Sequence, residues 1–164
     1  MPFIGIVSKE NDSNFIKNQI LKSAKLCEFE IININEESVV NIKNIKFETI
    51  IINDEIEELL SKSKYLEELM ENAKYIVVNS DIVKDISFLD DNKNTIITYG
   101  LNQNAIVTIS SIKEDKIMVC LQKSIKKANG ENIEEQETDI NIKKNNMKKV
   151  CNLLAVFTIL KIYE

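Results

Sequence analysis

A chain of 164 residues with a net charge of −5 and 44% hydrophobic residues fits a single globular domain. The acidic balance argues against a general role in binding DNA or RNA, because surfaces that bind nucleic acid are normally basic. The chain contains no histidine and no arginine, which removes the most frequent proton carrier of enzyme sites and the usual bidentate ligand for anions.

The first hundred residues alternate between buried-strand and amphipathic-helix patterns. Short apolar runs, rich in isoleucine, are separated by longer helical repeats, which is typical of a parallel sheet with crossover helices. We expect strands at residues 3–7, 29–34, 47–52, 75–79 and 95–99, and helices at residues 14–27 and 55–74.

After Gly100 the pattern changes to short alternating segments at residues 105–112, 116–125 and 134–142, which predict an antiparallel meander. Its turns are expected at Glu114-Asp115 and around Asn129-Gly130. The last predicted helix, at residues 145–163, has apolar residues on more than one face, so it is either sandwiched within the fold or shared with a partner protein or a second copy.

These elements predict one α/β domain over residues 1–164, with a Rossmann-like or P-loop-like architecture. A mostly parallel sheet with flanking helices occupies residues 1–100, and a small antiparallel β extension occupies residues 101–142. The terminal helix at 145–163 completes the domain.

The cysteines and the apolar runs of the sequence indicate in which cellular compartment the protein is expected. Cys27, Cys120 and Cys151 are odd in number and far apart, which predicts reduced thiols in a cytoplasmic protein and no zinc site. Met1 leads directly into the first strand, so we expect no signal peptide. The most apolar run, residues 150–162, is too short and too interrupted by polar residues to span a membrane.

The turn between the first strand and the first helix has the position of a phosphate-binding loop but contains no glycine. A backbone that wraps a pyrophosphate needs glycine where it turns, and Glu10 and Asp12 would repel phosphate. First-turn amides and the helix dipole still attract anions, so this turn provides candidate ligand-binding residues. They are Ser8, Lys9, Asn11 and Ser13. The simpler interpretation, which we favour, is that Asp12 or Ser13 caps the helix.

Polar residues also stand at or beyond the ends of two predicted strands: Asn53, Asp54, Asn79, Asp81 and Asp85. The carboxyl ends of parallel strands form the edge where open α/β sheets bind ligands. Asp54 and Asp81 are candidate ligands of Mg²⁺, although Asn and Asp also end strands for local reasons. No catalytic residue is predicted, because a serine or cysteine nucleophile needs a base beside it and histidine is lacking.

Four short motifs, in this order, resemble the central ATPase domain of the Mur ligase family, whose members add amino acids to peptidoglycan precursors. They are Ile4-Gly5-Ile6-Val7, Val77-Val78-Asn79-Ser80-Asp81, Ile96-Ile97-Thr98-Tyr99-Gly100 before Ala105-Ile106-Val107, and Val150-Cys151-Asn152-Leu153-Leu154-Ala155-Val156. The resemblance runs over most of the chain. It implies an α/β scaffold in which Asn152 lies near the base of a nucleotide.

The departures from the family bear on activity. Residues 8–14 replace the glycine-rich phosphate loop, and the histidine near the final helix and the family's two other domains have no counterpart. The resemblance therefore implies a degenerate, noncatalytic protein that serves as a binding or assembly module in the cytoplasm. Two alternatives stay open: a nucleotide- or small-ligand-binding protein or residual enzyme that uses the first loop with Mg²⁺, and an unrelated Rossmann-like regulatory domain.

Overall fold

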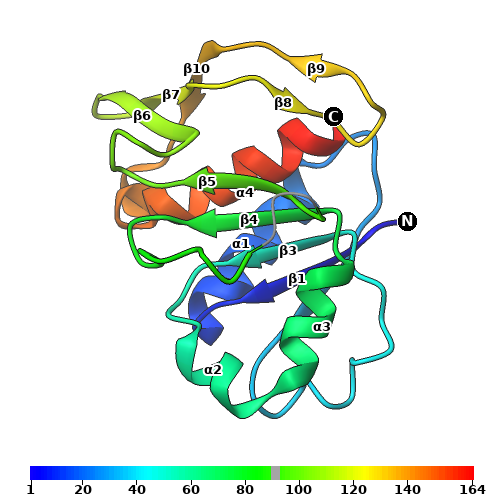
Figure 1. Cartoon of the computed structure of the whole chain (residues 1–164). Helices are drawn as coiled ribbons and strands as arrows, with labels where there is room; N and C mark the ends of the chain where they lie inside the picture. Colours follow the sequence, from blue (N-terminus) through cyan, green and yellow to red (C-terminus); the bar gives the residue numbers. More distant parts are fainter. Residues whose placement is uncertain (90–92) are drawn as a thin grey trace.

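The computed structural model describes residues 1–89 and 93–164 and confirms the α/β fold (Figure 1). Eight strands form one sheet in the order β10-β7-β6-β5-β4-β3-β1-β2, and two short strands form a separate hairpin. The strands are β1 Phe3–Val7, β2 Glu30–Asn33, β3 Thr49–Ile52, β4 Tyr75–Asn79, β5 Thr95–Tyr99, β6 Val107–Ile112, β7 Lys116–Leu121, β8 Ile125–Lys126, β9 Asn132–Ile133 and β10 Gln136–Asn141. The helices are α1 Glu10–Ser23, α2 Glu57–Lys62, α3 Lys64–Asn72, the 3₁₀ helix η1 Lys144–Lys149 and α4 Val150–Tyr163.

The parallel half of the sheet lies between two helical layers. Strands β1 to β5 pair in parallel, and every residue of β3 and β4 is buried because both faces are covered. Helices α1 and α4 pack on one face, while α2 and α3 pack on the other (Figure 1). The β-branched residues that dominate these strands fit such a two-sided core.

The antiparallel strands that the alternating pattern after Gly100 predicted are present, and they continue the same sheet. Strand β6 meets β5 at a single parallel pair, Tyr99 with Val107, and then pairs antiparallel with β7. Strand β10 completes this edge by pairing with β7. The turn around Asn129-Gly130 forms the β8–β9 hairpin, which packs against the end of α4 through a hydrogen bond of 2.7 Å from the Ala128 N–H to the Ile162 carbonyl.

Several helix boundaries differ from the predicted ones. Helix α1 begins at Glu10 and ends at Ser23, because a first turn rich in polar residues continues the helix without continuing its apolar pattern. The helix predicted at 55–74 is two helices, separated by the extended backbone of Ser63. Residues 145–149 of the last predicted helix belong to the 3₁₀ helix η1 that precedes α4.

Helix α4 is sandwiched within the fold. Nine of its fourteen residues are buried, since one side faces β4 and β5 and another faces α1. Burial on several sides explains why its apolar residues are not confined to one stripe. Over the described parts of the chain, no helix is both long enough and apolar enough to cross a membrane.

Candidate functional site

A pocket of about 250 Å³ lies at the carboxyl edge of the parallel strands, between the first turns of α1 and α4. The arrowheads of β1 and β4 in Figure 1 point toward this edge. Its lining residues are Lys9, Asp12, Asn53, Asp54, Asn79, Asp81, Ile82, Lys148, Cys151 and Asn152. It therefore stands where open α/β sheets bind ligands.

Asn53 is the centre of a buried hydrogen-bond network at this pocket. Its amide nitrogen donates to Ser8 Oγ and to Asn152 Oδ1, each at 3.0 Å. Its carbonyl oxygen accepts from Asn79 Nδ2 at 2.9 Å and from the Tyr99 hydroxyl at 2.6 Å. All the hydrogen-bonding positions of the Asn53 amide are used, so this buried polar group is fully satisfied.

Asp12, in the first turn of α1, connects that helix to the start of α4. Its Oδ1 accepts hydrogen bonds from Lys149 Nζ and from Asn152 Nδ2, both at 2.8 Å. The hydrogen bond from Lys149 has the largest effect on this carboxyl, and it holds the pKa of Asp12 below the ordinary value despite partial burial. An ionised carboxylate therefore occupies the helix end that would otherwise attract an anion.

The Asp81 carboxylate closes the turn after β5. It accepts hydrogen bonds from the Leu101 N–H at 2.6 Å, the Asn102 N–H at 3.1 Å and Asn102 Nδ2 at 2.8 Å. Partial burial alone would raise the pKa of Asp81, but these hydrogen bonds outweigh it and the pKa falls below its ordinary value. A Cβ at Gly100 would lie 2.8 Å from the carboxylate, so this close approach requires glycine.

Two further ionisable groups near the pocket stay protonated at neutral pH. Burial and the Asp81 charge raise the pKa of the Cys151 thiol to about 11, and its Sγ lies 3.8 Å from Asp81 Oδ2. Complete burial raises the pKa of the Tyr99 hydroxyl well above its ordinary value. Because a thiolate is needed for nucleophilic attack, Cys151 is a weak nucleophile here.

The structure brings together most of the predicted ligand-binding residues. Lys9, Asn79, Asp81 and Asn152 line the pocket, and Ser8 accepts a hydrogen bond from Asn53 beside it.

Asn11 and Ser13 lie elsewhere on α1. Asn11 is exposed, whereas Ser13 is buried and its hydroxyl faces the Ser8 carbonyl at 3.4 Å. The prediction that Asp12 or Ser13 caps α1 is wrong, because the helix already begins at Glu10 and Lys9 occupies the cap position without a side-chain hydrogen bond. The first turn of α1 consists of polar residues, so apolar periodicity does not indicate where the helix begins.

Of the two candidate magnesium ligands, Asp81 holds the turn after β5, whereas Asp54 makes a local hydrogen bond, as does Asp85. Asp54 Oδ1 accepts the N–H of Glu55 at 2.9 Å, and Asp85, which is exposed, accepts the N–H of Ser87 at 2.9 Å. Within residues 1–89 and 93–164, no group of three or more His, Cys, Asp or Glu side chains is arranged to hold a metal ion. These contacts are those of strand-ending turns.

Sequence reasoning did not identify the residues that complete the pocket. Lys148 and Cys151 line it at the junction of η1 and α4. The Tyr99 hydroxyl, at the end of β5, donates a hydrogen bond to Asn53 beside the pocket. Lys148 belongs to a lysine cluster at residues 143–149, which has no local pattern that assigns it to this edge, whereas Tyr99 and Cys151 stand within the quoted motifs.

Comparison of the chain with models of protein families and with curated proteins gave no match. The resemblance to Mur ligases therefore depends on the short motifs and their order. Three of those motifs contribute residues to this edge, since Asn79, Asp81 and Asn152 line the pocket and Tyr99 binds Asn53.

Proposed function

We propose that the protein is a noncatalytic binding module with a Mur-ligase-like scaffold, and that its carboxyl-edge pocket binds a small polar ligand. The observation that carries this proposal is the bridge from Asp12 to Lys149 and Asn152. It puts a fixed negative charge at the first turn of α1, the position where a phosphate-binding loop would present free N–H groups. A triphosphate entering there would meet a carboxylate with a lowered pKa.

Three ionisable groups of the pocket, Cys151, Asp12 and Asp81, are poorly suited to proton transfer near neutral pH. The raised pKa of Cys151, about 11, keeps its thiol protonated, and the lowered pKa values of Asp12 and Asp81 make both carboxylates weak bases. General acid–base catalysis works best with groups whose pKa lies near the working pH. These properties favour binding over catalysis.

The remaining hydrogen-bonding groups indicate the class of ligand. Asn152 uses one side-chain N–H within the network, toward Asp12, which leaves it a second donor. Lys9 and Lys148 add positive charge at the rim, and Asp54 adds negative charge. A pocket of about 250 Å³ with both signs of charge suits a zwitterion of amino-acid size better than a nucleotide.

Calorimetric titration and thermal-shift measurements test this function. Free amino acids should bind saturably, and Lys148→Ala and Asp54→Ala should each weaken that binding about tenfold or more by removing one charge partner. The matched controls Lys113→Ala and Asp115→Ala lie in the exposed β6–β7 turn and should leave the affinity unchanged. Failure of every amino acid to bind would reject this ligand class.

The competing function is nucleotide binding, which the presence of Lys9 and Lys148 in one pocket favours. Mg-ATP, ADP and UDP-sugar precursors belong in the same titrations for this reason. Saturable binding of Mg-ATP that Lys9→Ala abolishes would replace the proposed function with this alternative.

A further inference from the structure

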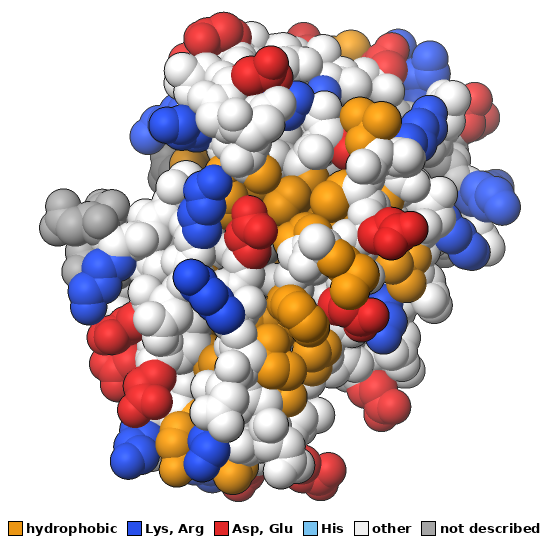
Figure 2. Space-filling model, turned by 90° about the vertical axis from the view of Figure 1, so that its right-hand side faces the viewer, with side chains coloured by type: hydrophobic (Ala, Val, Ile, Leu, Met, Phe, Trp, Pro, Cys, Tyr) orange, Lys and Arg blue, Asp and Glu red, His pale blue; other side chains and the backbone are white. Residues whose placement is uncertain are grey.

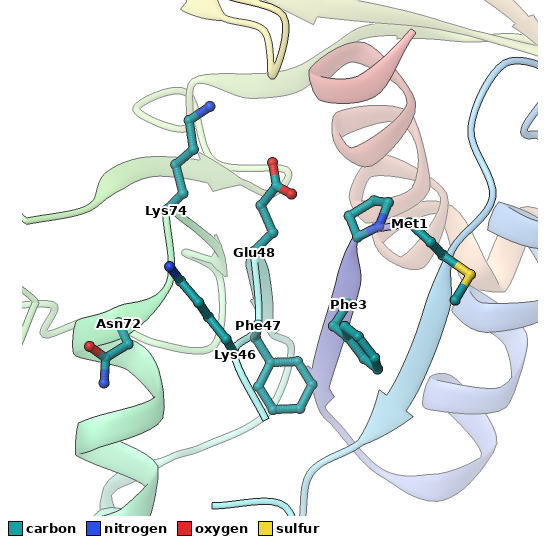
Figure 3. Close-up of a pocket in the computed structure, with 8 residues that line it drawn as sticks. Met1, Phe3, Lys46, Phe47, Glu48, Asn72 and Lys74 are labelled. Atoms are coloured by element: carbon teal, nitrogen blue, oxygen red, sulfur yellow. The ribbon is translucent and has the colours of Figure 1, made fainter. Parts of the chain in front are cut away.

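The opposite edge of the sheet, where the parallel strands begin, carries another hollow of about 310 Å³ (Figure 3). It is lined by Met1, Pro2, Phe3, Lys46, Phe47, Glu48, Asn72 and Lys74. We call this surface, together with Leu26, the amino-edge face. Figure 2 views the molecule from this side and shows hydrophobic side chains gathered in the middle of the face, with charged side chains among and around them.

This face holds the most exposed large apolar side chains of the described residues. Leu26 is 80% exposed and Met1 is 70% exposed. Leu26 belongs to the segment between α1 and β2. This segment leads into Glu30, the first residue of β2, whose N–H donates to the Pro2 carbonyl at 3.1 Å. The Leu26 N–H is itself held at 2.9 Å by the Glu164 carboxylate. A fixed backbone thus presents an apolar side chain to water at the same edge of the sheet as the hollow, and exposed apolar groups of this kind mark interaction surfaces.

The charges around the hollow have both signs and are not paired with each other. Within the described residues, no opposite charge lies within 4.0 Å of Lys46, Glu48 or Lys74. Figure 3 shows Glu48 between the two lysine side chains on one side and Phe3 and Met1 on the other. Lys74 Nζ donates to the Ala128 carbonyl at 3.4 Å and lies 5.1 Å from the centre of the Tyr75 ring, but neither contact neutralises its charge. The face therefore offers one negative and two positive groups without a counter-charge, which can bind charges from outside the chain.

We propose that the amino-edge face is the contact surface of a two-fold symmetric dimer, and that its occupant is a second copy of this chain. A two-fold interface uses the same patch on both copies, so the patch must complement itself. This face does so in shape, because it carries both a projecting Leu26 and a hollow floored by Phe47. It does so in charge, because Glu48 of each copy can lie against Lys46 and Lys74 of the other.

The mixture of charges also selects against other occupants. A partner segment of one sign would leave either Glu48 or the lysines buried without a counter-charge, which is costly in an interface. A second copy matches all three groups at once. The dimer would leave the carboxyl-edge pocket open, because that pocket lies at the other end of the strands.

Charge reversal tests the dimer directly by sedimentation equilibrium. The wild-type chain of 18.8 kDa should show a concentration-dependent shift toward twice that mass. Glu48→Lys alone, and Lys46→Glu with Lys74→Glu, should each raise the dimer Kd by about tenfold or more, because like charges then face each other. An equimolar mixture of these two variants should recover dimerisation, since every charged contact across the mixed interface is again attractive.

Two further variants complete the experiment. Leu26→Glu should also weaken the dimer, whereas Lys113→Glu, in the exposed β6–β7 turn, should not. All the substituted side chains except Glu48 are exposed, and thermal melts of each variant establish that it is folded. A wild-type chain that stays monomeric at the highest concentration measured would overturn the proposal. A dimer whose Kd is unchanged by these substitutions would also overturn it, as would an equimolar mixture of the two charge-reversed variants that does not dimerise.

Discussion

At the scale of single residues, Asn53 connects the ends of several strands to the terminal helix. Its hydrogen bonds reach Ser8 after β1, Asn79 in β4, Tyr99 in β5 and Asn152 in α4. Asn53→Ala would leave buried partners of this amide unsatisfied. We expect the free energy of unfolding in urea to fall by about 1–3 kcal/mol.

Asn141→Ala is the matched control for this measurement, because Asn141 is an exposed residue of the edge strand β10. It should change the free energy of unfolding by less than about 0.5 kcal/mol. Equal effects of the two substitutions would mean that the network adds nothing to stability.

Asp12 makes the free energy of unfolding depend on pH under acidic conditions. Its pKa in the folded chain is lowered from an ordinary value of 3.8, mainly by the hydrogen bond from Lys149. Such a group contributes stability that is present above its unfolded pKa and is lost as pH falls through the lower folded pKa. Urea unfolding from pH 6 to pH 2 should therefore show a smaller loss of stability for Asp12→Asn than for the wild type.

The other described carboxyls whose pKa is lowered, Asp81, Asp85, Glu58 and Glu131, are unchanged in this comparison, so the difference between the two pH profiles isolates Asp12. Lys149→Gln provides a second measurement, because it leaves the carboxyl in place and removes its main partner. Its profile should also be flatter than that of the wild type. Parallel profiles for all three proteins would contradict the assigned role of the ion pair.

The sequence predicted which polar residues end the strands, but not how they connect. Asn79, Asp81 and Asn152 could be singled out because strand ends and motif order are local features. The partners of Asp12 are 137 and 140 residues away in the chain, at Lys149 and Asn152. No local pattern encodes such a contact, which only the packing of α1 against α4 creates.

At the scale of elements, strands were predicted more accurately than helix boundaries. The bounds of β1, β4 and β5 match their predictions, because a short run rich in β-branched residues is a strong strand signal. The start of α1 and the break at Ser63 did not follow from apolar periodicity. Both depend on backbone geometry at polar residues, to which periodicity is insensitive.

Gly5 in β1 gives a prediction at this scale. A Cβ at Gly5 would overlap the Cδ1 atom of Ile34, just beyond β2, and would lie 3.3 Å from Phe47. Gly5→Ala should therefore lower the free energy of unfolding by about 1–3 kcal/mol through overpacking. Ile34→Val removes the overlapping Cδ1 atom, so we expect the double variant to be more stable than Gly5→Ala alone.

A double-mutant cycle from urea unfolding measures this coupling. Ile34→Val by itself should cost about 0.5–1.5 kcal/mol, since it leaves a small cavity. Additive effects of the two substitutions would mean that the contact between Gly5 and Ile34 does not limit the packing of β1. Ile42→Val, in the same layer of the core, is the control partner and should add to Gly5→Ala without compensation.

At the scale of the whole molecule, the sheet joins two apolar layers into one unit. Residues of β1, β3 and β4 alternate between the layer beneath α1 and α4 and the layer beneath α2 and α3. The alternation of strands and helices predicted this arrangement, and the change of pattern after Gly100 predicted the antiparallel half. The single paired position between β5 and β6 was not predictable from the sequence. It depends on the turn after β5, which is held by hydrogen bonds to Asp81, a residue that follows β4.

Since both layers share the same strands, we expect the domain to unfold in one cooperative transition. Leu154→Ala lies in the layer of α4 and Leu69→Ala in the layer of α3, and both side chains are buried. Each should cost about 2–5 kcal/mol. Both should shift the same urea transition without changing its slope, because the surface exposed on unfolding stays the same.

Two optical probes distinguish the layers in this experiment. Tyr65 packs on the α3 side, whereas Tyr75, Tyr99 and Tyr163 pack on the α4 side, so in a Tyr65→Phe background tyrosine fluorescence reports only the α4 layer. Far-UV circular dichroism reports the helices of both layers. Leu69→Ala in this background should shift the urea midpoints of fluorescence and circular dichroism together. The reason is that unfolding of the α3 layer exposes one face of the strands on which the α4 layer packs. A shift of circular dichroism with no shift of fluorescence would instead mean that the α2–α3 layer unfolds on its own.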